Sequence, residues 1–372
     1  MSAFNRLCRL LPLLAWSLAA SLAHAEAPCR VAYDIGSSGV RSGASNSDKT
    51  TRAGIDYLAA LRENGSLDAT VGPTVAALAE PFGKGWFDPA CARVGGGFSA
   101  WRLALQQGAD RLLPNLGRIR AESGVAVIVV PQNVEAAYGY LGARKLLGSR
   151  LATSHVLDIG GGSLQVAGEH ISFGDAIGQK LWHQQACQAL ARPGGLPCGL
   201  LPMTAGELAT VRTLLASRLR EAGAILGDPV TMTAISRPVT HGVAPAVQQL
   251  LDQARGQAAI SRADLGRAIA QLAGMRADDI STRLGIAPAY AAYLPSDMLL
   301  VEGLMQAFGV TELQLADIDL TNVPGLLADD AAYRWADHYG CYLARLARDG
   351  LDAYASDPAT CAAGGWRREP AR

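Results

Sequence analysis

Apolar residues along the chain fall into short continuous runs and into longer segments with helical spacing. The continuous runs predict buried strands at 31–35, 125–130 and 155–159. Between them, apolar residues recur every three or four positions, which predicts helices at 52–62, 74–80, 100–107 and 109–122. Strands that alternate with helices in this way are typical of an α/β fold.

A further helix is predicted after Pro131, with Asn133 as its N-cap, so that Glu135 lies in its first turn. One face of this helix would carry Val134, Tyr138 and Leu141. From about Thr204 onward the pattern is mostly helical. The segments concerned are 208–226, 243–251, 262–272 and 298–308, followed by a strand at 312–317 and a last helix at 330–348.

Two short segments of the chain are alike, because each is an apolar strand that runs into an aspartate and a turn rich in glycine and serine. They read Asp34-Ile35-Gly36-Ser37-Ser38-Gly39 and Asp158-Ile159-Gly160-Gly161-Gly162-Ser163, and their aspartates are 124 positions apart. A second extended stretch follows each turn, at 40–42 and 164–167. This repetition predicts two related domains that face one cleft.

Turns of this composition suit the binding of phosphate. Glycine and serine let successive backbone N–H groups point at one anion, and larger side chains would block the approach of its oxygens. Asp34 and Asp158 would then hold a hydrated Mg²⁺ that neutralises phosphate charge. Either turn alone could be an ordinary hairpin, so the prediction rests on the matched pair.

Composition and charge narrow the classes of protein. The chain has 372 residues, of which 49% are hydrophobic and 18% charged, so it can bury two cores and is not mainly disordered. It has 33 basic and 33 acidic residues. A nucleic-acid binder is normally strongly basic, so we expect no nucleic-acid partner, and an anionic partner must be held by a local site.

The first 25 residues have the features of a cleaved signal peptide. Arg6 and Arg9 precede a run of 13 mostly apolar residues, 10–22, that ends in Ala23-His24-Ala25. A retained membrane anchor is the alternative, but the run is short against the ~20 residues that a spanning helix needs. Cleavage would leave 31 basic and 33 acidic residues. We therefore expect a periplasmic protein without a membrane segment.

Six cysteines remain after this segment, an even number that suggests disulfides in an exported protein. No C-x-x-C pattern occurs, which favours structural pairing over a metal site. The pair Cys187–Cys198 brackets a loop that contains Pro193-Gly194-Gly195 and is the first choice. Cys341–Cys361 and Cys29–Cys91 then follow by elimination, although the sequence leaves the connectivity open.

The two turns resemble the phosphate motifs of the exopolyphosphatase and guanosine pentaphosphate phosphatase family, in the sugar kinase, heat-shock ATPase and actin superfamily. The more distant apyrases share both motifs. The segments Ser99-Ala100-Trp101-Arg102, Glu135-Ala136 and Leu294-Pro295 are similar to further parts of the family pattern. The resemblance implies two actin-like (ribonuclease H-like) α/β domains with a central cleft and helical additions in the C-terminal half.

The resemblance also implies roles for single residues. Glu135 matches the glutamate that orients and deprotonates the attacking water, although a glutamate in a first helical turn can also simply complement the helix dipole. Arg102 matches an arginine that binds phosphate, and Arg41 is a weaker candidate for the same role. The phosphate-binding set would be Gly36, Ser37, Ser38, Gly39, Arg41, Arg102, Gly160, Gly161, Gly162 and Ser163, with Asp34 and Asp158 as metal ligands.

Two turns of the family differ here, near Met232-Thr233-Ala234 and at Asp317-Ile318-Asp319-Leu320, which leaves the identity of the substrate open. The function expected is hydrolysis of terminal phosphoanhydride bonds of polyphosphate or a nucleotide polyphosphate with Mg²⁺. An apyrase-like nucleotidase and a non-catalytic sensor are the alternatives. The sequence also leaves the oligomeric state open, a homodimer included.

The expected organisation follows from these motifs. The boundaries are a signal peptide at 1–25, domain I at 26–150, domain II at 151–328, a C-terminal helix at 329–355 that packs back on domain I, and a tail at 356–372. The sequence has no motif for other common catalytic sites, since it lacks the G-x-S-x-G, H-E-x-x-H and P-loop patterns.

Overall fold

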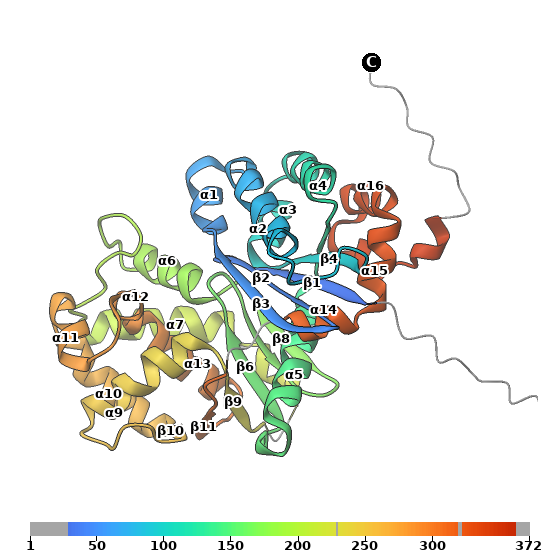
Figure 1. The fold of residues 1–372 in the computed structure, drawn as a ribbon. Coiled ribbons are helices and arrows are strands. Elements are labelled where there is room, and N and C mark those ends of the chain that lie inside the picture. Colours follow the sequence, from blue (N-terminus) through green and yellow to red (C-terminus); the bar gives the residue numbers. More distant parts are fainter. Residues whose placement is uncertain (1–28, 228–229, 319–321, 362–372) are drawn as a thin grey trace, which may run out of the picture.

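The computed structural model describes residues 29–227, 230–318 and 322–361. These residues form two sheets, each packed against helices, and helix α5 leads from the first sheet to the second (Figure 1). The expected signal peptide lies outside the described residues, as does most of the expected tail. None of the described helices is both long enough and apolar enough to cross a membrane.

The strands are β1 Arg30–Ile35, β2 Gly39–Ala44, β3 Ser47–Gly54, β4 Ala92–Gly97, β5 Ala126–Val129, β6 His155–Ile159, β7 Leu164–Ala167, β8 Ser172–Asp175, β9 Met232–Ala234, β10 Ala259–Ser261 and β11 Glu312–Leu315. The α-helices up to the middle of the chain are α1 Tyr57–Asn64, α2 Val71–Gly83, α3 Ser99–Gln107, α4 Ala109–Ser123, α5 Gln132–Leu147, α6 Gln179–Ala189, α7 Ala205–Arg218 and α8 Ala222–Leu226. The later ones are α9 Ala244–Leu250, α10 Arg262–Ala273, α11 Ile280–Leu284, α12 Pro288–Ala291, α13 Leu294–Ala307, α14 Val323–Ala328, α15 Asp330–Asp337 and α16 Tyr339–Asp349.

Both sheets repeat one arrangement of five strands. The first sheet has the order β3-β2-β1-β4-β5, and the second has β10-β11-β9-β6-β7-β8. In each, the strand that carries the aspartate (β1 or β6) pairs antiparallel with the strand after its turn and parallel with a later strand. Without β10, and written from its other end, the second sheet has the order β8-β7-β6-β9-β11, which corresponds strand by strand to the first. This is the duplication that the two similar motifs predicted.

The buried strands have the residues that a parallel sheet covered by helices requires. Every residue of β5 is buried, as expected for a strand with apolar neighbours on both faces. Opposite faces of β4 are covered by different helices: a side chain at Gly96 would meet Leu326 of α14, and one at Gly97 would meet Trp101 of α3. Successive residues of a strand point to opposite faces, so the first sheet is packed on both.

Several predicted elements differ in the structure. The helix predicted at 52–62 is wrong at its start, because 52–54 belong to β3 and Asp56 caps α1 by accepting a hydrogen bond from the Ala59 N–H. The cap predicted at Asn133 is also wrong, because α5 begins at Gln132, directly after Pro131. The last helix is two helices that meet at His338, whose backbone leaves the helical conformation.

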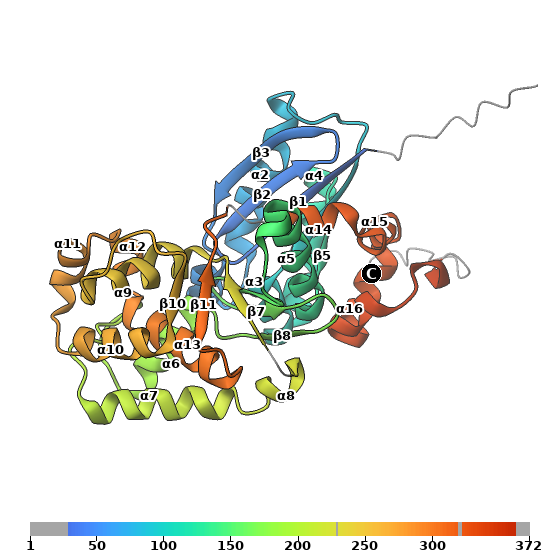
Figure 2. The same cartoon turned by 90° about the horizontal axis from the view of Figure 1, so that it is seen from below.

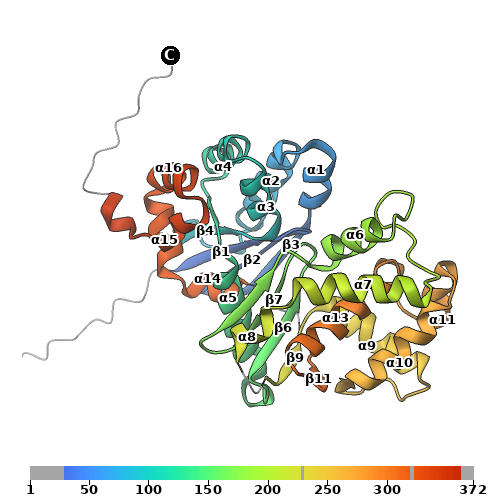
Figure 3. The same cartoon turned by 180° about the vertical axis from the view of Figure 1, so that it is seen from behind.

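The end of the chain returns to the first sheet (Figure 3). Three tyrosines of α15 and α16 attach it by hydrogen bonds. Tyr342 Oη accepts from the Val129 N–H at 2.8 Å, while the hydroxyls of Tyr333 and Tyr339 donate to carbonyls of β1 and β5. Val323 and Leu326 of α14 already belong to the core of the first sheet, so the chain crosses back before α15.

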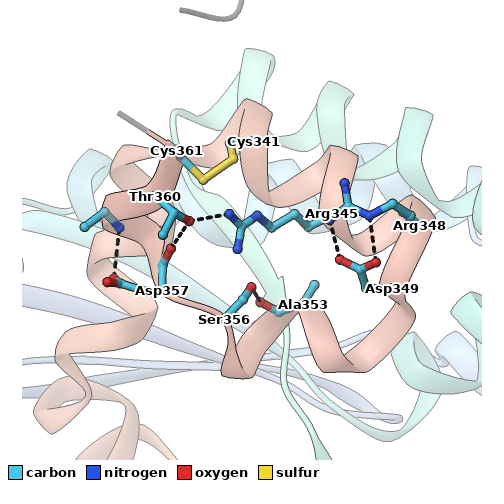
Figure 4. Close-up of a disulfide and its surroundings, with 10 residues drawn as sticks. Cys341, Arg345, Arg348, Asp349, Ala353, Ser356, Asp357, Thr360 and Cys361 are labelled. Carbon is cyan, nitrogen blue, oxygen red and sulfur yellow. Dashed lines mark hydrogen bonds and ion pairs between the residues drawn. A yellow bond between two sulfur atoms is a disulfide. The ribbon is translucent and has the colours of Figure 1, made fainter. Parts of the chain in front are cut away.

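The structure contains three disulfides, and they join the pairs expected from the sequence: Cys29–Cys91, Cys187–Cys198 and Cys341–Cys361. The last one ties α16 to the short helical turn at its C-terminal side (Figure 4). The Arg345 guanidinium donates to Thr360 beside this bridge. The disulfides therefore reinforce both cores, with Cys91 buried in the first and Cys187 in the second.

Candidate active site

A cavity of about 660 Å³ lies between the two sheets. Its walls come from β1, β2 and β3 of the first sheet, from the β6–β7 turn, and from the segments before α9 and around α12. Helix α5 packs on β6, β7 and β8 of the second sheet and also contacts α14, which belongs to the core of the first sheet (Figure 2). The Gln132 side chain at the start of α5 donates to the carbonyls of Leu164 and Asp175, which fixes α5 on the second sheet.

The first glycine-serine turn connects β1 to β2 at this cavity. Gly36 N–H donates to the Gly39 carbonyl at 3.0 Å and closes the turn. A Cβ atom at Gly39 would lie 2.2 Å from the Ala53 carbonyl oxygen, so only glycine lets β3 approach here. The carbonyls of Ser37 and Ser38 accept from the N–H groups of Tyr57 and Ile55, which hold the turn against the start of α1.

The second turn is built in the same way and lies directly against the first. Gly160 N–H donates to the Ser163 carbonyl at 2.8 Å, and the carbonyls of Gly160 and Gly161 accept from the first N–H groups of α6. A Cβ atom at Gly161 would lie 2.7 Å from Ser37 Oγ and 3.3 Å from Ser38 Oγ. The two turns therefore meet across the boundary between the domains, as the sequence predicted.

The two aspartates occupy equivalent strand positions and share one electrostatic environment. Burial raises the pKa of Asp34 to about 6, and the charge of Glu135 adds to the rise. The hydrogen bond that the Asn322 N–H donates to Asp34 and the charge of Arg41 both lower this pKa. Burial raises the pKa of Asp158 to about 7, and the charges of Glu135 and Asp34 raise it further. Three carboxyl groups thus repel one another at the centre of the cavity.

Glu135 is held in this centre by two side chains from other elements. It is 8% exposed, and its Oε2 atom lies 2.7 Å from the Arg102 guanidinium. The Gln165 amide donates to the same oxygen at 3.0 Å and to Ser163 Oγ at 3.1 Å. Arg102 also donates to the Val130 carbonyl and to Ser163 Oγ. This network fixes the carboxylate of Glu135 at the cavity wall.

Most of the residues singled out from the sequence come together at the cavity. Those that line it are Asp34, Gly36, Ser37, Ser38, Gly39, Arg41, Glu135, Asp158, Gly160, Gly161 and Ser163. Two do not. Arg102, expected to bind phosphate, is 5% exposed and lies behind Glu135, and Gly162 packs against Ser99 and Leu58. Arg102 is therefore placed to position Glu135 rather than to contact a ligand in the cavity.

Sequence reasoning missed other residues of the site. Gln165 is the cross-strand partner of Asp158, and it could have been found because it lies two positions after Ser163 on the strand that leaves the turn. Gln179 and Lys180 line the cavity from the start of α6, and Arg52 and Arg237 line it as well. These residues had no signal in the sequence, because distant segments bring them to the cavity.

The donor set fits a divalent cation of the Mg²⁺ type. Such cations prefer oxygen ligands, and Mg²⁺ keeps several of its water molecules while binding one or two carboxylates. Asp34 and Asp158 face one cavity, and burial together with mutual repulsion raises the pKa of each. A cation between them would relieve that repulsion. Among the described residues, the clusters of His, Cys and acidic groups close enough to hold a metal both consist largely of disulfide cysteines, so they are not alternatives.

Two related α/β domains that bring glycine-rich turns and aspartates to a shared cavity define a protein of the actin-like ATPase superfamily. Residues 115–323 match the model of the Ppx/GppA phosphatase family. This match covers more than half of the chain, and the protein belongs to that family.

Solved structures agree with this fold. The Ppx/GppA phosphatase of Aquifex aeolicus, in its type II variant, has a TM-score of 0.57 at 15% identity, covering 81% of this chain and 98% of that one. An exopolyphosphatase from Cytophaga hutchinsonii has a TM-score of 0.56 at 15% identity, covering 83% of this chain and 98% of that one. The expected fold of two actin-like domains is confirmed.

A curated relative adds little about activity. An uncharacterized protein of Streptomyces coelicolor is 41% identical over 69 residues, and this stretch spans 18% of the chain and 20% of that protein.

Proposed function

We propose that this protein is an Mg²⁺-dependent phosphohydrolase that cleaves terminal phosphoanhydride bonds of polyphosphate or a nucleotide polyphosphate by attack of water. One observation supports it above the others. Asp34, Asp158 and Glu135 face one cavity at the point where two glycine-serine turns meet. Membership of a phosphatase family agrees with this chemistry.

The turns are suited to hold the terminal phosphates. They join equivalent strands of the two sheets, and Gly161 of one packs against Ser37 and Ser38 of the other. A phosphate group in the cavity beside this contact would be reached from both domains by backbone N–H groups and by hydroxyls such as that of Ser38, which is exposed. This arrangement binds the substrate only when the two domains lie together.

The metal ion would be held by Asp34 and Asp158 through its water molecules. Enzymes of this family generally depend on a divalent metal ion. When bound, Mg²⁺ supplies positive charge that offsets the negative charge of the phosphate oxygens. The raised pKa values of the two aspartates, at about 6 and 7, reflect burial and repulsion that a cation at this position would counteract.

Glu135 is placed to act on the attacking water. Arg102 and Gln165 both contact its Oε2 atom, so the carboxylate keeps one orientation and its other oxygen is left for a water molecule at the cavity wall. That oxygen can accept the proton of the water as the new bond to phosphorus forms. The role of Arg102 in this scheme is to position Glu135.

The test is the release of phosphate by the purified mature protein. Long-chain polyphosphate, tripolyphosphate, ATP, ADP and guanosine polyphosphates would be compared with and without Mg²⁺. We expect release from at least one of these substrates, and loss of activity when EDTA removes the metal. No release from any of them with Mg²⁺ present would reject the proposed activity.

Glu135→Gln is the first variant to make. The amide keeps the shape of the side chain but cannot take a proton, so kcat should fall by a factor of roughly 10² to 10⁴ while the substrate still binds. Calorimetric titration checks binding, and the melting temperature controls for damage to the fold, since Arg102 loses its counter-ion. Full activity in a folded variant would show that Glu135 is not the base.

The nucleotide alternative is favoured by one observation. Tyr290 and Tyr293, from the segment around α12, line the wall of the cavity that the second domain provides. An aromatic ring there could stack on a nucleobase, which polyphosphate lacks. Comparison of ATP with tripolyphosphate separates the two, because a base contact would lower KM for ATP alone.

We also infer that the protein works in the periplasm. Three disulfides persist where the environment is oxidising, and the six cysteines outside the expected signal peptide are all paired. Fractionation of cells that produce the full chain tests this inference, and recovery from the cytoplasm with the N-terminal segment retained would contradict it.

A further inference from the structure

We propose that a second cavity, between α1 and α3 of the first domain and α6 of the second, binds a small aliphatic carboxylate that joins the two domains beside the catalytic cavity. This ligand is distinct from the substrate, so the existence of the site does not depend on the function proposed above.

The second cavity is much smaller than the catalytic one. Its volume is about 210 Å³, below the ~300 to 1,000 Å³ of sites that hold drug-sized molecules. Such a volume takes the space of roughly seven water molecules at ~30 Å³ each, which corresponds to a ligand of about seven or eight non-hydrogen atoms. A nucleotide is therefore too large for this cavity.

Five leucines give the cavity an apolar surface, and both domains contribute to it. Leu58 and Leu61 come from α1, Leu103 from α3, Leu181 from α6 and Leu196 from the loop that the Cys187–Cys198 disulfide closes. Burying an aliphatic chain against such a surface is favourable, because apolar area is removed from water.

The charged residues of the cavity favour an anionic head group. Among the described residues that line it, Arg62 and Lys180 are cations and Asp56 is an anion. Lys180 Nζ lies 2.7 Å from Asp56 Oδ2, so these two charges offset each other. Arg62 pairs with the adjacent Glu63 at 3.4 Å, and such an exposed pair is weak. A positive charge is thus left for the ligand.

The effect of Arg62 on a neighbouring side chain places its charge at the cavity. Burial raises the pKa of Tyr293, the charge of Asp56 raises it further, and the charge of Arg62 lowers it. Tyr293 itself lines the cavity. A guanidinium group can bind both oxygens of a carboxylate in a bidentate manner, so Arg62 suits a carboxylate at the end of an aliphatic chain.

The two cavities are physically linked. Lys180 lines both of them, and Leu196 of the second is followed in the chain by Pro197 of the catalytic cavity. Leu58 packs against the second glycine-serine turn, since a Cβ atom at Gly162 would lie 3.2 Å from Leu58 Cδ1. A ligand that contacts both domains favours the arrangement in which they lie together, so it should strengthen binding in the catalytic cavity as well.

The first experiment is calorimetric titration of the purified mature protein with hexanoate, which has about the expected size. Affinity should rise more than tenfold from butanoate to hexanoate, at roughly fourfold per methylene group, and no further with octanoate, because the cavity is then full. Hexylamine should bind much more weakly, since its ammonium group meets Arg62. No binding of hexanoate, or equal binding of hexylamine, would overturn the site.

Variants locate the binding. Arg62→Gln should raise the Kd for hexanoate about threefold to tenfold, as for the loss of one charge-assisted contact at an exposed position. Arg118→Gln is the matched control, because Arg118 is an exposed arginine of α4 that lines neither cavity. Leu196→Ala should weaken hexanoate more than butanoate. Equal effects of the two arginine variants would show that hexanoate binds elsewhere.

The link to the catalytic cavity is measured in the Glu135→Gln variant with tripolyphosphate. Bound tripolyphosphate should lower the Kd for hexanoate about fivefold, and hexanoate should lower the Kd for tripolyphosphate by the same factor. Unchanged Kd values for two ligands that both bind would refute the link. Absence of tripolyphosphate binding would instead count against the proposed function, and the hexanoate titration without it would still decide the second site.

Discussion

At the scale of single residues, the most consequential contact is the buried ion pair of Arg102 and Glu135. Removing charged groups from water costs several kcal/mol per ion, and only good geometry with further hydrogen bonds recovers it. Here Arg102 also donates to Val130 and Ser163, and Gln165 supplies a second donor to Glu135. The pair therefore serves to fix the carboxylate of Glu135, the proposed base, more than to stabilise the fold.

Asp297 is a second buried carboxyl and lies outside this network. Its Oδ2 atom accepts from the Gln179 amide at 2.6 Å, and its Oδ1 atom is buried without a partner in the described structure. Burial raises the pKa of Asp297 to about 8. The folded protein therefore favours the protonated form, and the stability that this proton provides is complete below about pH 4 and is lost progressively up to about pH 8.

Asp297→Asn should remove this dependence, because the amide stays neutral at every pH. We expect the melting temperature of the variant to exceed that of the parent by roughly 3 °C at pH 8 and to equal it at pH 4. Thermal unfolding followed by circular dichroism between pH 4 and 8 measures the difference. Curves that stay parallel over this range would show that Asp297 does not titrate as described.

The site was only partly predictable from single residues. The repeated turns with Asp34 and Asp158 could be predicted from the sequence, because each aspartate and the glycines of its turn are close together in the chain. The resemblance to the family predicted that Arg102 binds phosphate, and nothing in the sequence indicates its contact with Glu135. Its contact with Glu135 joins α3 to α5, and Arg52 reaches the cavity only through the pairing of β2 with β3. Such tertiary contacts leave no local pattern.

At the scale of elements, the long apolar runs were predicted well and the short or polar strands were not. The predicted helix at 52–62 overlapped β3, whose mostly exposed, polar residues have no clear alternation. The three residues of β9, near which a turn of the family differs, pair with both β6 and β11, and the sequence pattern predicted no strand there. Neighbouring strands, rather than their own sequence, determine these elements.

The disulfide of α16 provides a prediction at this scale. Replacing Cys341 and Cys361 by alanine should destabilise the protein by roughly 3 kcal/mol, because the unfolded chain gains freedom. Activity at low temperature should persist, since neither cysteine lines the cavity. Urea denaturation and phosphate release measure the two effects.

A matched control is the pair Cys187 and Cys198. This bridge holds the loop that carries Pro197, which does line the cavity, so its removal should reduce activity as well as stability. A loss of activity in the folded Cys341 and Cys361 variant would contradict the separation of roles.

At the scale of the whole molecule, the site exists only where the two domains meet. The first turn belongs to one domain, the second turn to the other, and Gly161 packs on Ser37. An ion pair beside the cavity also links the domains: Lys180 Nζ at the start of α6 lies 2.7 Å from Asp56 Oδ2 at the start of α1. Both side chains are partly exposed, and such pairs contribute about 0.2 to 1 kcal/mol.

Asp56→Asn isolates this link from the fold of α1. The asparagine can still accept the hydrogen bond from the Ala59 N–H, so the helix cap is kept while the ion pair is lost. If the pair helps to hold the two domains together around the cavity, KM should rise by a factor of roughly 2 to 5 with little change in stability. The ratio of the two KM values should shrink at high salt, which screens the pair in the parent.

Steady-state kinetics at low and high ionic strength test this expectation, with the melting temperature as a control for the cap. A lower KM in Asp56→Asn would contradict it and would mean that the ion pair with Asp56 keeps Lys180 from binding the substrate. The two outcomes are distinct because Lys180 lines the cavity and Asp56 does not. A fall in KM would therefore indicate that Lys180 binds phosphate, whereas a rise would indicate that its ion pair with Asp56 links the two domains.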